Sequence, residues 1–171
     1  MAVPHDTRIQ SAVNTFEEAN ARMVKLLEAL SDDAARRAPS DGGWNPAQVG
    51  HHVAITNELF AGILAGAVPL TKPAPSGFTE NPGIFAGVPP RVQTLPPLQP
   101  PSEAARAGAI ERLRASQTSL VSAMKALPAD RAAAEVMDLP FGTITMYQAA
   151  EFTGAHVARH IEQIHRCTAG V

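Results

Sequence analysis

Apolar residues recur at spacings of three and four in four separate parts of the chain, the pattern of amphipathic helices that bury one face. The first part runs from Asp6 to Leu30, and Asp6 or Thr7 is in position to cap it. Its apolar face consists of Ile9, Val13, Phe16, Met23, Leu27 and Leu30. The third part is expected to open at Ser102 and Glu103 and to end before Pro128. Its stripe consists of Ile110, Leu113, Leu120, Met124 and Leu127.

The second and fourth helices have clearer starts. Asn45 is a suitable N-cap, and Pro46 takes the first helical position, where its missing N–H is not needed. His52 then lies in line with an apolar face, whereas the adjacent His51 is rotated away from it. The fourth helix lies in the stretch 141–166, where Thr145 is the expected N-cap and Gln148 completes a capping box.

The helical pattern is lost between Ala67 and Pro101. Ten of the fifteen prolines of the chain lie in this segment, so no regular helix is expected there. The segment is nevertheless too apolar for a solvated linker, which predicts a strap that packs on the surface, near a site or a partner chain. The apolar residues concerned are Phe78, Ile84, Phe85, Val88, Val92, Leu95 and Leu98.

Four long helices without the alternation typical of strands predict an all-α protein, a four-helix bundle whose second and third helices are joined by the proline-rich segment, about 67–101. Residues 129–138 are expected to add only a short turn. A chain of 171 residues, 45% hydrophobic and with a net charge of −2, suits a single globular domain covering residues 1–171 and offers no basic patch for nucleic acid. The lack of a signal pattern or membrane span and the single Cys167 favour a cytoplasmic location.

The candidate chemistry lies in three histidines. His156 and His160 are four residues apart, so they lie on one helix face, close enough to share a metal ion. If the second and fourth helices are neighbours, His52 supplies a third nitrogen. Three neutral imidazoles leave coordination positions open, as in catalytic sites, and zinc and nickel both suit such ligands. Gln163 lies on the same face, where it would orient a ligand or a bound water.

A bundle without any metal is the alternative interpretation. Histidines one turn apart also occur in helices that bind nothing, and Glu58 and Glu151 are expected to be solvated charges rather than general bases. The chain has no nucleophile elbow, no phosphate-binding glycine loop, no paired cysteines and no His-Glu-x-x-His motif. The three-histidine centre is therefore the only specific chemistry that the sequence indicates.

Two segments resemble the DinB/YfiT-like superfamily. The first is GWNPAQVGHHV at 43–53, with His52 eight residues after Trp44, and the second is LPFGTITMYQAAEFTGAHVARHIEQI at 139–164, with a His-x-x-x-His-x-x-Gln pattern. The resemblance implies an up-down-down-up four-helix bundle in which His52, His156 and His160 hold a metal, often zinc or nickel. It also implies that dimers are common. The long proline-rich segment departs from the compact pattern of the family.

Members of that superfamily include S-transferases that use bacillithiol, mycothiol or glutathione, mycothiol-dependent maleylpyruvate isomerases and metal-dependent hydrolases. Our first hypothesis is accordingly an enzyme whose divalent metal activates a low-molecular-weight thiol for transfer to an electrophile. The second is a hydrolase that activates water with the same metal. The third is a noncatalytic stress-response bundle that binds a small apolar or metal ligand. The expected partners are a small-molecule substrate and a second copy of the chain, with no nucleic acid and no membrane.

Overall fold

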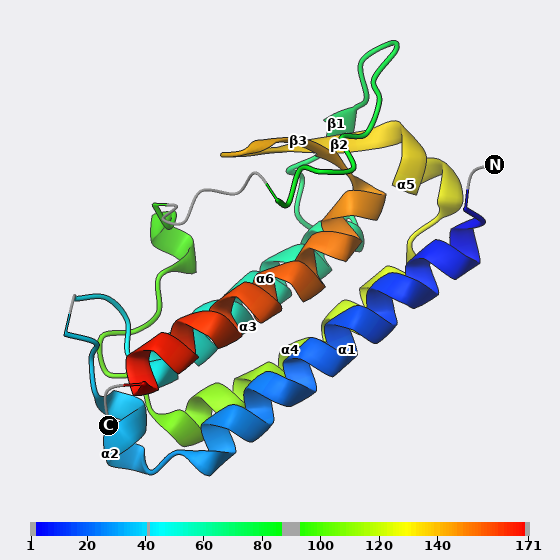
Figure 1. Ribbon diagram of the computed structural model, residues 1–171. Helices are drawn as coiled ribbons and strands as arrows, with labels where there is room; N and C mark the ends of the chain where they lie inside the picture. The colour runs from blue at the N-terminus through cyan, green and yellow to red at the C-terminus, as the bar shows by residue number, and fades with distance from the viewer. Residues whose placement is uncertain (1–2, 41, 87–92, 170–171) are drawn as a thin grey trace.

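The computed structural model describes residues 3–40, 42–86 and 93–169, and it is mostly helical (Figure 1). The long helices are α1 (His5–Ala29), α3 (Pro46–Leu64), α4 (Arg106–Ala126) and α6 (Met146–Thr168). The short elements are α2 (Asp32–Arg36), α5 (Ala129–Ala134), the 3-10 turn η1 (Pro96–Leu98) and the strands β1 (Lys72–Pro73), β2 (Glu135–Leu139) and β3 (Gly142–Thr145). None of the helices in the described ranges is long and apolar enough to cross a membrane.

The four long helices lie side by side around one apolar core (Figure 1). Helix α1 packs beside α4 and α6, and α3 packs beside the same two helices. Fully buried side chains such as Phe16, Met23, Leu113, Met124 and Ile164 fill the space between them. Because α3 and α6 are neighbours, the helix face that carries His52 meets the face that carries His156 and His160.

Both histidine-bearing helices begin at the predicted N-caps, and each start is fixed by a capping box, which was predicted for Thr145 but not for Asn45. The Asn45 side chain accepts a hydrogen bond from the Gln48 backbone N–H at 2.9 Å, and the Gln48 side chain accepts one from the Asn45 N–H at 3.1 Å. Thr145 and Gln148 make the same pair of hydrogen bonds at the start of α6. Each box satisfies N–H groups that a helix start leaves without intrahelical partners.

The predicted starts of the other two long helices are wrong by one to four residues. Helix α1 begins at His5, because the Pro4 carbonyl already accepts from the Arg8 N–H at 3.0 Å. Helix α4 begins at Arg106 rather than at Ser102 or Glu103. The Gln48 side chain donates to the carbonyls of Pro101 and Ser102, both at 3.4 Å, and thereby holds this backbone outside the helix.

The chain is mostly helical, as predicted, but the expectation of no strands and of only a short turn at 129–138 is wrong. Helix α5 and strand β2 occupy that stretch, and β1, β2 and β3 form a small antiparallel sheet at one end of the helices (Figure 1). Strands β2 and β3 form a hairpin in which Val136 pairs with Thr145 and Leu139 with Gly142. Gly142 has a φ of +141°, and a Cβ there would lie 2.9 Å from Ile84 Cδ1. Strands of two to five residues are too short to show a clear alternation in the sequence.

Part of the proline-rich segment is fastened to the start of α6 and to α1. Glu80 pairs with Arg8 at 2.9 Å and accepts a hydrogen bond from the Thr145 hydroxyl, and the Asn81 carbonyl accepts from the Gln148 side chain at 2.9 Å. Ile84 is buried, whereas Leu95 is exposed. The predicted apolar contacts of Val88 and Val92 fall outside the described residues. The segment therefore packs down around residues 80–85, as a strap would.

A close approach between α1 and α6 gives a stability prediction. A Cβ at Gly154 would lie 3.0 Å from Thr15 Cγ2 and 3.2 Å from the Phe16 backbone nitrogen, which cannot move aside. We expect Gly154→Val to lower the free energy of unfolding by about 1–3 kcal/mol, measured by urea denaturation. Gly108→Ala in α4 is the control, since its Cβ would meet nothing closer than 3.5 Å. That change should be neutral or stabilising by up to about 1 kcal/mol. Equal effects of the two substitutions would contradict this account of the helix contact.

Candidate metal centre

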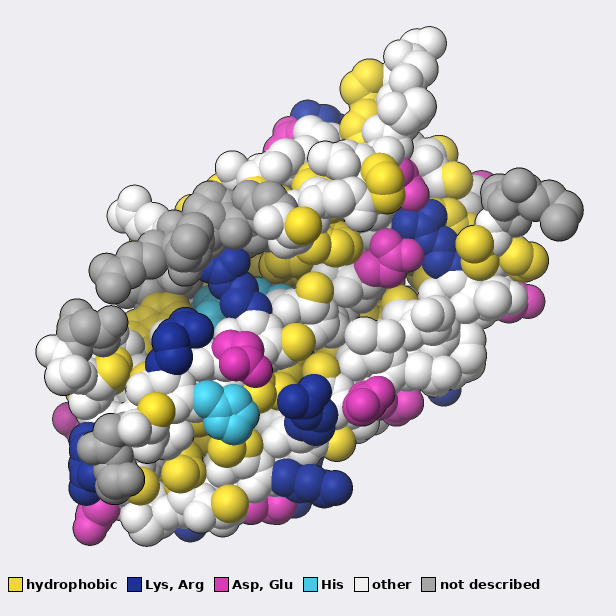
Figure 2. All heavy atoms as spheres, in the orientation of Figure 1, with side chains coloured by type: hydrophobic (Ala, Val, Ile, Leu, Met, Phe, Trp, Pro, Cys, Tyr) yellow, Lys and Arg dark blue, Asp and Glu magenta, His cyan; other side chains and the backbone are white. Residues whose placement is uncertain are grey.

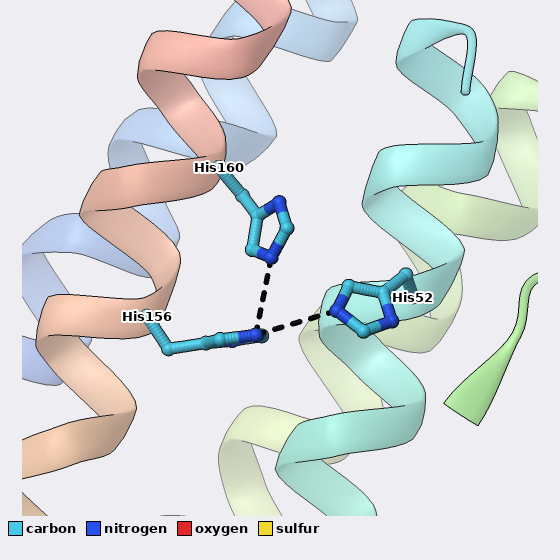
Figure 3. Close-up of side chains that lie close together, drawn as sticks. All are labelled: His52, His156 and His160. Carbon is cyan, nitrogen blue, oxygen red and sulfur yellow. Dashed lines mark hydrogen bonds between the residues drawn. The ribbon is translucent and has the colours of Figure 1, made fainter. Parts of the chain in front are cut away.

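Three imidazole rings converge in the space between α3 and α6 (Figure 3). The Nε2 atom of His156 lies 3.3 Å from Nε2 of His52 and 3.1 Å from Nε2 of His160. One ring nitrogen from each residue lies within 4.8 Å of the other two. The structure thus brings together the three residues that the sequence singles out.

Hydrogen bonds on the far side of two rings determine where their protons lie. The Nδ1–H of His52 donates to the Leu98 carbonyl at 2.7 Å, and the Nδ1–H of His160 donates to Oε1 of Gln163 at 2.8 Å. A carbonyl oxygen can only accept, so each of these neutral rings keeps its proton on Nδ1. The lone pairs on Nε2 therefore point into the cluster, which is the arrangement that a metal ligand needs.

His156 has a different environment. Its Nδ1 atom is buried and has no hydrogen-bond partner among the described residues. If His156 carries its proton on Nε2, that N–H can donate to Nε2 of His52 or to Nε2 of His160, but not to both at once. One buried lone pair in the cluster would then have no hydrogen-bond donor. An unsatisfied buried polar group costs about 1–3 kcal/mol. The protein alone does not satisfy this cluster.

The donor set fits a divalent cation. Tetrahedral zinc sites with Zn–N distances of 2.0–2.1 Å place their ligand nitrogens about 3.3 Å apart. The two Nε2 separations from His156, 3.1 and 3.3 Å, are close to that value, and one ring nitrogen of each residue lies within 4.8 Å of the other two. A cation shared by three lone pairs would also remove the competition for one proton. The residues present therefore fit a divalent metal site made of imidazoles.

Burial keeps the three rings neutral. It is the main cause that lowers the pKa of His160 to about 3 and that of His156 well below its ordinary value. The neighbouring imidazoles add to the shift, since a positive charge on one ring disfavours a second. Burial also lowers the pKa of His52. At neutral pH a metal ion would meet free lone pairs rather than protons.

The other histidines and carboxylates considered from the sequence lie elsewhere. His51 donates to the Ala105 carbonyl, and His5 contacts the Tyr147 hydroxyl. Glu58 pairs with Arg112 at 2.7 Å on the surface, and Glu151 pairs with Arg8 at 2.6 Å in a half-buried position. In the part of the chain that the structure describes, no carboxylate or cysteine joins the three imidazoles.

Two neighbours of the centre were not identified from the sequence. The Leu98 carbonyl that orients His52 is a backbone group of the proline-rich segment, and a backbone acceptor has no residue-type signal. The second neighbour is Phe152, whose ring lies 5.3 Å from the ring of His156. The ring of Trp44 lies 4.7 Å from the ring of His52. Aromatic rings therefore lie next to two of the three imidazoles.

Comparison with known proteins gives one match. The family model of the DinB superfamily matches residues 15–164, which include all three histidines and both segments of resemblance. No curated protein and no solved structure gives a significant match. The three-histidine cluster is compatible with metal binding in such a protein. Since the match covers most of its length, the chain belongs to the DinB superfamily.

Proposed function

We propose that His52, His156 and His160 hold a divalent metal ion, zinc or nickel, and that the protein transfers a low-molecular-weight thiol to an electrophile. The observation that carries the proposal is the convergence of three neutral imidazoles. Nε2 of His156 lies 3.3 Å from Nε2 of His52 and 3.1 Å from Nε2 of His160, and hydrogen bonds at Nδ1 orient the rings of His52 and His160. When bound, the cation would lower the pKa of a thiol in an open coordination position. The Leu98 carbonyl and Gln163 hold the ligand rings in place.

The ordinary pKa values of thiols and water favour a thiol as the group that the metal activates. A free thiol has a pKa of about 8.5, far below that of bulk water, so the thiol needs a much smaller shift to ionise near pH 7. The apolar rings of Trp44 and Phe152 lie beside the imidazoles, and electrostatic interactions next to such apolar surface are stronger than in bulk water. The rival hypothesis is hydrolysis by metal-activated water, and assays with and without thiol distinguish the two.

The test is turnover by the zinc- or nickel-loaded protein. Bacillithiol, mycothiol and glutathione are each offered with 1-chloro-2,4-dinitrobenzene or iodoacetamide, and product formation is followed. In each reaction the sulfur displaces the halide, and the thiol proton leaves with it as the hydrogen halide. We expect turnover with at least one thiol and a fall of at least about 100-fold in His160→Ala, a loss typical of a lost metal ligand or its support.

Two controls separate the proposal from its rivals. His51→Ala removes the histidine next to His52 but outside the cluster, and it should retain full activity. Ester and amide substrates without thiol test the hydrolase. Activity that persists unchanged in His160→Ala would overturn both enzyme proposals, and turnover of esters alone would replace the first by the second.

A prediction concerns Gln163, whose side chain accepts the Nδ1–H of His160. Gln163→Leu removes the acceptor and should weaken zinc affinity by about 10- to 100-fold, measured by competition with a chromophoric chelator. Gln163→Glu keeps an acceptor at the same place and should retain most of the affinity. Equal zinc affinities in Gln163→Leu and the wild-type protein would show that this hydrogen bond does not position the ligand.

We also propose that the four long helices have the up-down-down-up order of the family. It is supported by the starts of α1 and α6 at the end with the sheet and of α3 and α4 at the opposite end (Figure 1). A single domain, a homodimer and a cytoplasmic location remain predictions from the sequence and its resemblance.

A further inference from the structure

Four of the six phenylalanines of the chain gather beside the histidine cluster. They come from four places: α3 (Phe60), the proline-rich segment (Phe85), the turn between β2 and β3 (Phe141) and α6 (Phe152). The ring centre of Phe152 lies 5.1 Å from that of Phe60, 5.9 Å from that of Phe85 and 5.7 Å from that of Phe141. We name these four residues the phenylalanine wall. Its central ring, Phe152, also contacts His156 at 5.3 Å.

The wall is only partly covered. Phe60 is buried, whereas Phe85, Phe141 and Phe152 are each half-buried. By contrast, Phe16 in the bundle core is completely buried. The face of the molecule between α6 and the proline-rich segment is hollowed, with histidine side chains in the hollow and hydrophobic side chains beside them (Figure 2). Aromatic surface therefore remains accessible next to the three imidazoles.

Polar and apolar contacts hold the two non-helical members of the wall in place. Phe85 follows Ile84, which is buried against Gly142, and Phe141 precedes Gly142. The same segment is fastened by Glu80 to Arg8 and by the Asn81 carbonyl to Gln148. The contact between Ile84 and Gly142 thus places Phe85 and Phe141 beside Phe152. The proline-rich segment, the turn between β2 and β3 and helix α6 thus each contribute one of these three rings.

The chemistry of the wall selects what it can bind. Phenylalanine rings offer no hydrogen bond and no charge, so an apolar group gains most by burial against them. Aromatic rings pack at centroid distances of 4.5–7 Å in tilted or offset arrangements, and the rings of the wall already lie 5.1–5.9 Å apart. A further flat ring can join such a set at similar distances.

We propose that the phenylalanine wall binds the aryl group of the substrate and so sets the protein's preference for aromatic electrophiles. This proposal rests on the proposed function, because it takes the metal held by the three histidines as the reacting centre. The binding of an aryl group by the wall is nevertheless measurable without any reaction. The wall contacts the side of His156 through Phe152, so an aryl group bound there lies beside the reacting centre.

The test compares two probes that share a nitro group and carry no displaceable halide, nitrobenzene and nitroethane, at a pH low enough to keep nitroethane neutral. Binding to the full-length, zinc-treated protein is measured by equilibrium dialysis. We expect saturable binding of nitrobenzene at one site per chain and at least tenfold weaker binding of nitroethane. Phe85→Ala and Phe141→Ala should each weaken nitrobenzene binding by roughly five- to tenfold. Phe78→Ala is the matched control, since Phe78 is half-buried in the same proline-rich segment but outside the wall, and it should leave binding unchanged.

The possible outcomes distinguish a failure of the proposed aryl site from a failure of the proposed metal site. Nitrobenzene binding no tighter than nitroethane binding, or a loss in Phe78→Ala equal to that in Phe85→Ala, would overturn the inference. Zinc content measured on the same samples should be unchanged in the wall variants. Wall-dependent nitrobenzene binding in a protein that takes up no zinc would refute the proposed function while the aryl site stands. If an alanine variant fails to fold by circular dichroism, Phe85→Leu, which removes the ring but keeps apolar volume, is expected to show the same weakening.

Discussion

Zinc or nickel is expected to raise the melting temperature of the protein by about 10 °C at a metal concentration near 1,000 times the dissociation constant. Such an excess stabilises the folded state by about 4 kcal/mol when the unfolded chain does not bind the metal. For a chain of this size each kcal/mol moves the melting temperature by about 2–4 °C. We expect a large effect because the three ring nitrogens already converge within 4.8 Å of one another, with His156 at 3.1 and 3.3 Å from the other two.

The experiment compares variants that lose a proposed ligand with a control variant that loses a nearby histidine outside the cluster. His156→Ala and His160→Ala remove ligands and should abolish the metal-dependent rise, whereas His51→Ala should keep it in full. Differential scanning calorimetry with and without a chelator measures all four proteins. The same rise in His156→Ala as in the wild-type protein would mean that the metal stabilises some other part of the molecule.

The metal-free protein is expected to lose stability as the pH falls from about 6.5 toward 3. In the unfolded chain a histidine has a pKa of about 6.5, but burial lowers the pKa of His160 to about 3 in the folded protein. Between these values the unfolded state binds a proton that the folded state excludes, so stability rises with pH across the window and is lost on acidification. The slope approaches about 1.4 kcal/mol per pH unit for each such histidine. His156, whose pKa burial also lowers, adds to it.

Urea denaturation at pH 7 and pH 5 in the presence of a chelator measures this effect. Paired carboxylates such as Asp32 and Asp138 also titrate at low pH, because Arg106 and Lys72 lower their pKa values. The difference between the wild-type protein and His160→Gln isolates the histidine. Between pH 7 and pH 5 the variant should lose about 2 kcal/mol less than the wild-type protein. An equal loss in both proteins would show that His160 is protonated in the folded state.

Much of the helical layout was predictable because its signals are local. The capping boxes at Asn45 and Thr145 and the long apolar stripes specify where α3 and α6 begin and which faces they bury. Those faces carry His52, His156 and His160, so the candidate site followed once the two helices were taken as neighbours. The family match over residues 15–164 agrees with that reading of the chain.

The features that sequence reasoning missed depend on contacts between distant segments. The start of α4 is displaced because a side chain of α3, Gln48, binds the carbonyls of Pro101 and Ser102. Strand β1 has two residues and contains Pro73, so its pairing with β2 comes from tertiary position rather than from strand propensity. The Leu98 carbonyl accepts a hydrogen bond from His52, and a backbone carbonyl gives no signal in the pattern of residue types. Each of these depends on where the proline-rich segment lies in space.

The central claim is that the three histidines hold one divalent metal ion, and elemental analysis of the purified protein tests it most directly. The account predicts close to one equivalent of zinc or nickel per chain, either as purified or after loading and removal of excess metal. It predicts that His52→Ala and His156→Ala retain less than about a tenth of that amount, as expected when one of three ligands is lost. A wild-type protein that carries no metal and cannot be loaded, or alanine variants that keep the full equivalent, would contradict it.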